Sequence, residues 1–219
     1  ISKNDQEAAH HGQAIDKNNT TRKGLNESIT KEALDLIAGD SGFSQRKSTV
    51  LFNPAWHKGV IGIVASKLTD EFYRPTVILT ESNGMVSGSA RSVKDFDVYN
   101  AIESCSELLE QFGGHMYAAG LTLRRENVDA FREKFEMIVS ETIEDRMLTR
   151  EIEIDDEINL DEINSAFYNV LKQFAPFGPG NMSPVFVSKN VVDKGSARIV
   201  GNNHLKLALR HSEIGRAHV

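Results

Sequence analysis

Strand-like and helix-like segments alternate through the middle of this 219-residue chain, from about Ser48 to Glu144. Short apolar runs, such as STVLFN (48–53) and RPTVILTE (74–81), flank a segment with helical periodicity, HKGVIGIVASKLTDEFY (57–73). Strands that alternate with helices are typical of a sheet on which the helices pack. We therefore expect an α/β fold for this region.

The same alternation continues toward Glu144. The sequence predicts a strand over GMVSGSAR (84–91), a helix over VYNAIESCSELLEQF (98–112) and a short strand over LTLR (121–124). An amphipathic helix follows, from Glu126 to about Glu144. Its expected buried face consists of Val128, Phe131, Phe135, Ile138 and Val139.

Different patterns precede and follow this region. Apolar residues recur at three- and four-residue steps near the end of Asp5–Ala38, which predicts a long helix capped by Gly39. The series consists of Ile15, Leu25, Ile29, Ala33, Leu34 and Ile37. After Arg150, EIEIDDEI predicts a strand and LDEINSAFYNVLKQF (160–174) predicts a helix. The expected inward residues of that helix are Leu160, Ile163, Phe167, Val170, Leu171 and Phe174.

Two strand patterns, SPVFVSKNVV (183–192) and NHLKLALRH (203–211), come after the turn PFGPGN (176–181). They resemble the beginning of a small oligonucleotide-binding (OB) β-barrel, which needs about five strands. We therefore expect the barrel to be truncated.

These patterns divide the chain into four parts. We expect a connector helix at 1–42, an α/β sheet domain at 43–146, a partial barrel at 147–212 and a non-native tail at 213–219. Because the chain lacks an initiator Met and ends on EIGRAHV, we expect a fragment at both ends.

Composition narrows the class of protein. No run approaches the roughly 20 apolar residues of a membrane span, and the polar start lacks the apolar core of a secretory signal. The single cysteine, Cys105, cannot form an internal disulfide, which fits a reducing compartment. We expect a cytoplasmic protein with no membrane association.

The net charge of −6 is concentrated in one segment. From Glu141 to Glu162, ten acidic residues face two arginines, a local net charge of −8 that leaves +2 for the rest of the chain. Such a run is typical of a solvated linker. The total charge therefore does not exclude a nucleic-acid partner.

The segment SGSARS (87–92) combines hydroxyls with a guanidinium. Ser87, Ser89 and Arg91 alternate, so on a strand they point to the same side. Arginine supplies a planar fork of donors and serine adds a donor without bulk, which together suit a phosphate. The alternative is a solvent-exposed sheet edge.

The segment FGGHMYAAG (112–120) places glycines beside a histidine. Gly113 and Gly114 would let a ligand approach the backbone closely. His115 could contact a phosphate or base, act as a general acid or ligate a metal, and we favour ligand contact. The small residues at 118–120 would allow close packing of a neighbouring helix or strand.

Trp56 and His57 precede a helix whose first turn contains Gly59. A helix start can receive an anion and an indole can stack on a base, so both residues are candidates for substrate binding. Trp56 could equally belong to the core. Gly62 would permit close contact between this helix and the sheet.

Metal chemistry has little support in the sequence. Asp95 and Asp97 could share a cation, but Asp97 stands where a helix N-cap is expected. No acidic cluster of the kind that a two-metal hydrolase needs is present, and His10 and His11 lack an aspartate partner. We assign no metal ligand and no catalytic residue to this chain.

The three motifs together resemble those of the RecJ family, single-stranded-DNA-specific exonucleases of the DHH phosphoesterase superfamily. NPAWHKGVIGIVASKL (53–68), SGSARS and FGGHMYAAG are similar to motifs of the DHH-associated domain of that family. PFGPGN with GNNHLKLALR (201–210) resembles the start of its OB domain. The long first helix resembles the connector between the catalytic domains. The resemblance covers nearly all of the chain except the tail.

The resemblance implies a role for each motif. Ser89 and Arg91 would grip the 5′ phosphate of single-stranded DNA, and His115 with Gly113 and Gly114 would contact the nucleotide near the scissile bond. Two Mn²⁺ or Mg²⁺ ions would be held by a DHH domain that is absent here, so the chain alone should be inactive. The implied enzyme is a monomer that degrades strands from the 5′ end, with a single-strand-binding protein or a helicase as partner.

Two alternatives remain open at this point. A different DHH phosphoesterase would act on oligoribonucleotides or cyclic dinucleotides, although the PFGPGN segment counts against it. A non-catalytic module that binds single strands is the other alternative.

Overall fold

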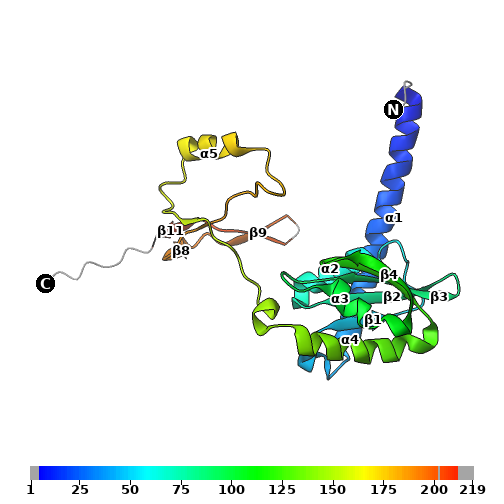
Figure 1. The fold of residues 1–219 in the computed structure, drawn as a ribbon. Helices are drawn as coiled ribbons and strands as arrows, with labels where there is room; N and C mark the ends of the chain where they lie inside the picture. Colours follow the sequence, from blue (N-terminus) through cyan, green and yellow to red (C-terminus); the bar gives the residue numbers. More distant parts are fainter. Residues whose placement is uncertain (1–4, 202, 212–219) are drawn as a thin grey trace. The chain divides into compact units, whose positions relative to one another are not determined.

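A mixed five-stranded sheet lies at the centre of the first of two structural units in the computed structural model, which describes residues 5–201 and 203–211 (Figure 1). The units divide between Arg150 and Glu151. The strand order is β1-β2-β3-β5-β4, with β1 and β2 parallel and the other pairs antiparallel. The bounds are β1 Thr49–Phe52, β2 Thr76–Ser82, β3 Met85–Arg91, β4 Leu109–His115 and β5 Ala118–Leu123. The expected α/β fold is confirmed.

Each face of the sheet has its own apolar core. Val77 and Leu79 of β2 pack with α3 (Val98–Glu103) and α4 (Val128–Thr142), whereas Ile78 between them packs with helices on the other face. Those helices are α1 (Asp5–Ala38) and α2 (Ile61–Phe72). The alternation follows from the two-residue period of a strand.

The long first helix is confirmed, with its expected bounds. Ile29, Ala33 and Ile37 are buried against α2, because a three- and four-residue spacing places them on one side. Ile15, expected on the same apolar series, is 59% exposed. The packed part of α1 is therefore confined to its last turns.

The expected helix over 98–112 is wrong in its second half. Asp97 caps α3 by accepting a hydrogen bond from the Asn100 N–H at 3.0 Å, but the helix ends at Glu103. Leu109–His115 instead forms β4, an edge strand paired with β5. The residues of this segment favour a helix by local propensity, and the pairing with β5 overrides that preference.

Short 3-10 turns join these elements. In chain order they are η1 Phe43–Gln45, η2 Ser106–Leu108, η3 Arg125–Asn127, η4 Asp145–Leu148 and η5 Lys172–Phe174.

The second unit consists of short elements. Its helix is α5 (Ser165–Leu171), and its strands form the antiparallel pairs β8–β11 and β9–β10 and the parallel pair β6–β7. The bounds are β6 Asp156–Glu157, β7 Phe186–Val187, β8 Val191–Asp193, β9 Arg198–Val200, β10 His204–Lys206 and β11 Leu209–His211. The expected strand over EIEIDDEI is reduced to β6, and β9 was not expected.

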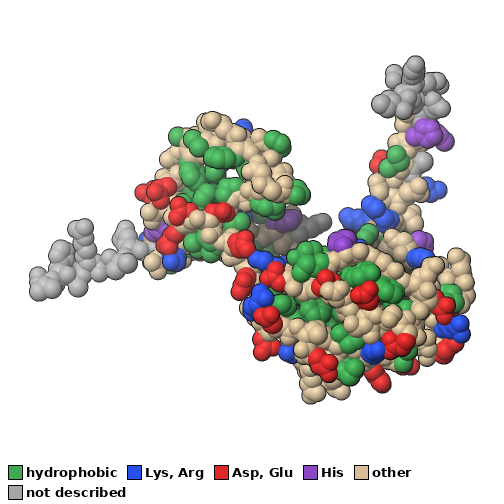
Figure 2. Space-filling view, viewed as in Figure 1, with side chains coloured by type: hydrophobic (Ala, Val, Ile, Leu, Met, Phe, Trp, Pro, Cys, Tyr) green, Lys and Arg blue, Asp and Glu red, His purple; other side chains and the backbone are tan. Residues whose placement is uncertain are grey.

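No residue described in the second unit is buried, and apolar side chains lie on its surface (Figure 2). Ile163, Val170 and Phe174, which were expected to face inward, are exposed, so that expectation is wrong. The short strand pairs provide too little sheet surface to cover them. The expected non-native tail at 213–219 lies outside the described residues. No helix in the described part of the chain is long and apolar enough to cross a membrane.

Candidate functional site

Three rows of residues cross β3, β5 and β4 on the sheet face where α2 packs. Residues directly opposite each other in antiparallel strands point to the same face, so each row is a set of neighbours. The rows are Arg91–Ala118–His115, Ser89–Gly120–Gly113 and Ser87–Thr122–Gln111. We call these nine residues the open face, and we number the rows in that order.

Arg91 and Ser89 form a preorganised pair of donors. Arg91 Nη1 donates to Ser89 Oγ at 3.0 Å and to the Ala90 carbonyl at 2.7 Å, which fixes the guanidinium beside the hydroxyl. Within the described residues no carboxylate pairs with Arg91. The remaining guanidinium donors are therefore available to an anion.

The start of α2 lies directly over this pair. A Cβ on Gly62 would lie 3.0 Å from both Arg91 Nη2 and Ser89 Oγ, so the glycine provides the space that these two side chains occupy. No side chain caps α2, so backbone N–H groups of its first turn can donate hydrogen bonds to an anion. Three donor types therefore converge from two elements.

A cavity of about 360 Å³ lies between α2 and β3. Arg91 and Lys58 bring two positive charges to it, and no acidic residue lines it. Its lining consists of Lys58, Gly59, Ile61, Gly62, Ile63, Ser87, Gly88, Ser89 and Arg91. Positive charge, hydroxyls and a helix start are the groups that proteins use to hold phosphate.

His115 lies at the end of row one that is farthest from Arg91. The two residues are separated by two strand spacings, about 10 Å. His115 is exposed, and its Nδ1 accepts the Tyr117 N–H at 3.3 Å. A neutral imidazole whose Nδ1 is an acceptor carries its proton on Nε2, so the outer nitrogen is a donor.

The two adjacent glycines have different roles. A Cβ on Gly113 would meet no atom within 4 Å, so this position leaves the open face bare. A Cβ on Gly114 would lie 2.3 Å from the Ala118 carbonyl oxygen, and the φ of +153° is one that other residues rarely adopt. Gly114 is therefore a glycine because β4 and β5 approach closely there, and its Cβ position faces β5.

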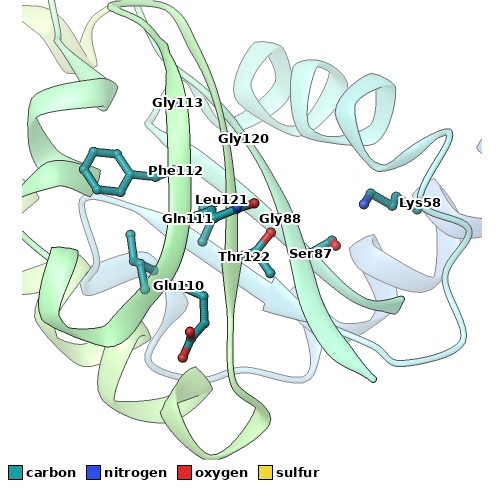
Figure 3. A pocket seen from close by; sticks show the side chains of 11 residues that line it. Lys58, Ser87, Gly88, Glu110, Gln111, Phe112, Gly113, Gly120, Leu121 and Thr122 are labelled. Atoms are coloured by element: carbon teal, nitrogen blue, oxygen red, sulfur yellow. The ribbon is translucent and has the colours of Figure 1, made fainter. Parts of the chain in front are cut away.

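A larger cavity of about 640 Å³ adjoins the first and shares Lys58, Ser87 and Gly88 with it (Figure 3). Its other lining residues are Leu109, Glu110, Gln111, Phe112, Gly113, Gly120, Leu121 and Thr122. Figure 3 shows the row-three side chains Gln111, Thr122 and Ser87 extending to the side from which Lys58 approaches, whereas Phe112 points away. The open face thus continues from row one to row three.

Trp56 and His57 lie outside both cavities. Trp56 is 3% exposed, and its indole Nε1–H donates to Glu32 Oε2 at 2.9 Å. A buried indole offers no face to a base, so of the two interpretations the structure supports the core. His57 is exposed, and its Nδ1 accepts the Gly59 N–H at 3.0 Å, which shapes the turn before α2.

The structure brings Ser89, Arg91, Gly113 and His115, which belong to two separate sequence motifs, to one face. Lys58, Gln111 and Thr122 also line the open face or its cavities, and they were not predicted from the sequence. Lys58 stands within the HKG turn, where a cation at a helix start could have been noticed. Gln111 was hidden by the helix prediction for its segment.

In residues 5–201 and 203–211, no group of three or more His, Cys, Asp or Glu side chains could hold a metal ion. The open face offers nitrogen cations, hydroxyls and an amide. These groups suit an anion and a base edge, and they do not fit a divalent metal centre.

The chain matches two family models. The DHHA1 domain matches residues 46–141, and the RecJ OB domain matches residues 154–218. The first match covers the region with the α/β pattern, and the second covers the region with the barrel pattern.

Curated relatives of this chain are named RecJ exonucleases. The single-stranded-DNA-specific exonuclease RecJ of Bacillus subtilis is 32% identical over 96% of this chain and 27% of its own length. The RecJ of Haemophilus influenzae is 29% identical over 92% of this chain and 36% of its own length. The chain therefore spans about a third of the relatives it matches.

A solved structure extends the agreement to the fold. RecJ from Thermus thermophilus in complex with Mn²⁺ has a TM-score of 0.81 and 26% identity, over 95% of this chain and 30% of its own. A DHHA1 domain followed by a RecJ OB domain, with this similarity to RecJ proteins across nearly the whole sequence, shows that the chain belongs to the RecJ family.

Proposed function

We propose that this chain is the substrate-binding part of a single-stranded-DNA-specific exonuclease, and that the open face holds the 5′ end of the strand. The relatives named above carry that activity in their names, and this chain spans only 27% and 36% of their lengths. The chain supplies the binding surface, and the hydrolysis belongs to the whole protein.

The observation that carries the proposal is the Ser89–Arg91 pair beneath the uncapped start of α2. A terminal phosphate has two negative charges and more free oxygens than an internal phosphodiester. A cavity with two cations, a hydroxyl and helix N–H groups therefore favours the terminal group. This preference would place the end of the strand in a fixed register.

Each side chain has a distinct task in this scheme. The Arg91 fork donates to two phosphate oxygens, Ser89 adds a donor at its side, and Lys58 contributes a flexible charge. His115, on the far strand, donates its Nε2–H to the nucleotide next to the scissile bond. Together these contacts orient the reacting bond, which is a major part of catalysis.

The metal ions are assigned to a DHH domain of the whole protein. Solved RecJ structures are described with Mn²⁺ or Mg²⁺, and such ions lower the pKa of a bound water and stabilise the phosphoryl charge. The residues described here form no metal centre, so they contribute binding and orientation.

Fluorescence anisotropy of the full chain with short single-stranded DNA tests the proposal. We expect the 5′-phosphorylated strand to bind about tenfold more tightly than the 5′-hydroxyl strand, and Arg91→Ala to abolish this preference. Arg91→Lys should restore only part of it, because lysine lacks the planar fork. An equal-length RNA and a cyclic dinucleotide serve as competitors that distinguish the other phosphoesterase classes.

Arg132→Ala is the matched control. Arg132 lies on α4, pairs with Asp129 at 2.8 Å and lines neither cavity. This variant removes the same charge and should keep the phosphate preference. Equal affinity of the unmodified chain for both DNA ends would overturn the assignment of the 5′ phosphate to Arg91.

A further inference from the structure

Row three of the open face carries polar groups that nothing else in the fold uses. Within the described residues, the side chains of Ser87, Thr122 and Gln111 make no hydrogen bond. Ser87 is 5% exposed, so its unpartnered hydroxyl is turned into the cavity that it lines. The described part of the fold does not use these three side chains for hydrogen bonds, so they are available to a ligand in the larger cavity.

The spacing of the rows fits one nucleotide. Ser87 and Arg91 are four residues apart on β3, which separates rows three and one by about 13 Å along the strand. Between them, row two presents Gly120 and Gly113, where a Cβ would meet at most one atom within 4 Å. A sugar can lie flat on this bare strip while the phosphate stays at row one.

The charges around the far end of the larger cavity favour a neutral base there over a second phosphate. Glu110 lies on that side and is paired with Arg124 at 2.7 Å, so the Arg124 charge is already engaged and the pair has no net charge. Among the described residues, the only cation that lines the larger cavity is Lys58, which it shares with the proposed phosphate site, so nothing else attracts a second phosphate. A neutral base edge is compatible with an amide and two hydroxyls.

We propose that row three is a subsite for the base of the 5′-terminal nucleotide, with Gln111 as its main contact. The inference rests on the proposed function, because it takes the phosphate position from row one. The Gln111 amide presents a donor and an acceptor, and a half-turn about its last bond exchanges them. It can therefore pair with an edge of any base, and the hydroxyls of Thr122 and Ser87 adapt in the same way.

The test compares 5′-phosphorylated strands whose first nucleotide is normal or abasic, in the anisotropy assay with the full chain. We expect the abasic strand to bind about fivefold more weakly to the unmodified chain, the size of one net hydrogen bond. Gln111→Ala should bind the normal strand about fivefold more weakly and lose its sensitivity to the missing base. Changing the identity of that base should alter affinity less than twofold.

Gln45→Ala is the control, since Gln45 is exposed and lines neither cavity. Thr122→Ala should reduce the abasic effect in part, and circular dichroism verifies the fold of each variant. If the normal and abasic strands bind equally while the 5′-phosphate preference persists, the base subsite is wrong and the phosphate site stands. A Gln111→Ala chain that retains the full abasic penalty also overturns the subsite. Loss of the phosphate preference in the unmodified chain overturns the proposed function itself.

Discussion

Gly62 at the start of α2 faces Arg91 on β3 so closely that a Cβ at position 62 would lie 3.0 Å from the guanidinium Nη2. The same Cβ would lie 3.0 Å from Ser89 Oγ. The start of α2 and the end of β3 are more than twenty residues apart in sequence, and they approach closely because position 62 has no side chain. The donor pair of the proposed phosphate site depends on this gap.

Gly62→Ala should therefore impair phosphate recognition without harming the fold. The nearest atoms are the ends of side chains, which can move, and alanine favours a helix by up to about 1 kcal/mol over glycine. We expect an unchanged or raised melting temperature together with loss of most of the 5′-phosphate preference, measured by thermal unfolding and anisotropy. Gly24→Ala in α1, where a Cβ meets nothing within 4 Å, should leave the affinities for the 5′-phosphorylated and the 5′-hydroxyl strand unchanged.

The adjacent glycines of β4 should separate stability from binding. Gly114→Ala forces a Cβ to within 2.3 Å of the Ala118 carbonyl oxygen at an unfavourable φ, so we expect a loss of at least about 2 kcal/mol in unfolding free energy. Gly113→Ala has open space and should leave stability within about 0.5 kcal/mol. Urea unfolding measures both.

The same two variants also test the open face. Gly113→Ala should weaken strand binding, because its methyl group stands on the bare strip between rows one and three. A stable Gly114→Ala chain would contradict the close approach of β4 and β5.

Trp56→Phe tests the role of the buried indole. The change leaves Glu32 without the Nε1–H donor and opens a small void, so we expect a loss of about 1 to 2 kcal/mol in unfolding free energy. Binding of single-stranded DNA should stay within twofold, since the ring is in the core. A stacked base would instead cost about 1 to 3 kcal/mol of binding free energy when the ring changes.

Local sequence patterns correctly predicted features that repeat within a single helix or strand. The spacing of Ile29, Ala33 and Ile37 predicted the packed end of α1, and the alternation of Ser87, Ser89 and Arg91 predicted their common side. These features depend on the period of one element. They can therefore be read without knowing what lies opposite.

Features that depend on a distant partner were missed. The residues from Leu109 to Phe112 favour a helix, but they pair with β5 and form part of β4 instead. Gln111 reaches the open face only through that pairing, so no local pattern could place it there. In the second unit, strands of two or three residues are too short for an alternating pattern to be detected, as for β9.

Cys105 predicts a dependence on pH. Burial raises the pKa of its thiol to about 11, whereas an unfolded cysteine has a pKa of about 8.5. The folded pKa is the higher one, so this contribution to stability is complete below pH 8.5 and is lost as the pH rises toward 11. At pH 9 we expect alkylation of the native chain to be about a hundredfold slower than in urea. Comparable rates in both states would show that the thiol is accessible.

Lys58 provides the last prediction, through the salt dependence of binding. Its side chain lines both cavities and has no ion pair within the described residues, so its charge is available to the strand. Each phosphate contact on a single strand contributes about 0.7 to the slope of log affinity against log salt concentration. We expect Lys58→Gln to reduce this slope by about 0.7.

The matched control lies on the same helix. Lys67 is exposed on α2 and lines neither cavity of the open face, so Lys67→Gln removes an equal charge without touching the proposed path of the strand. Anisotropy titrations at four salt concentrations give the slope for each chain. Equal slopes for the two variants would mean that Lys58 acts only through the general charge of the protein. A smaller slope for Lys58→Gln alone would place a phosphate beside the start of α2.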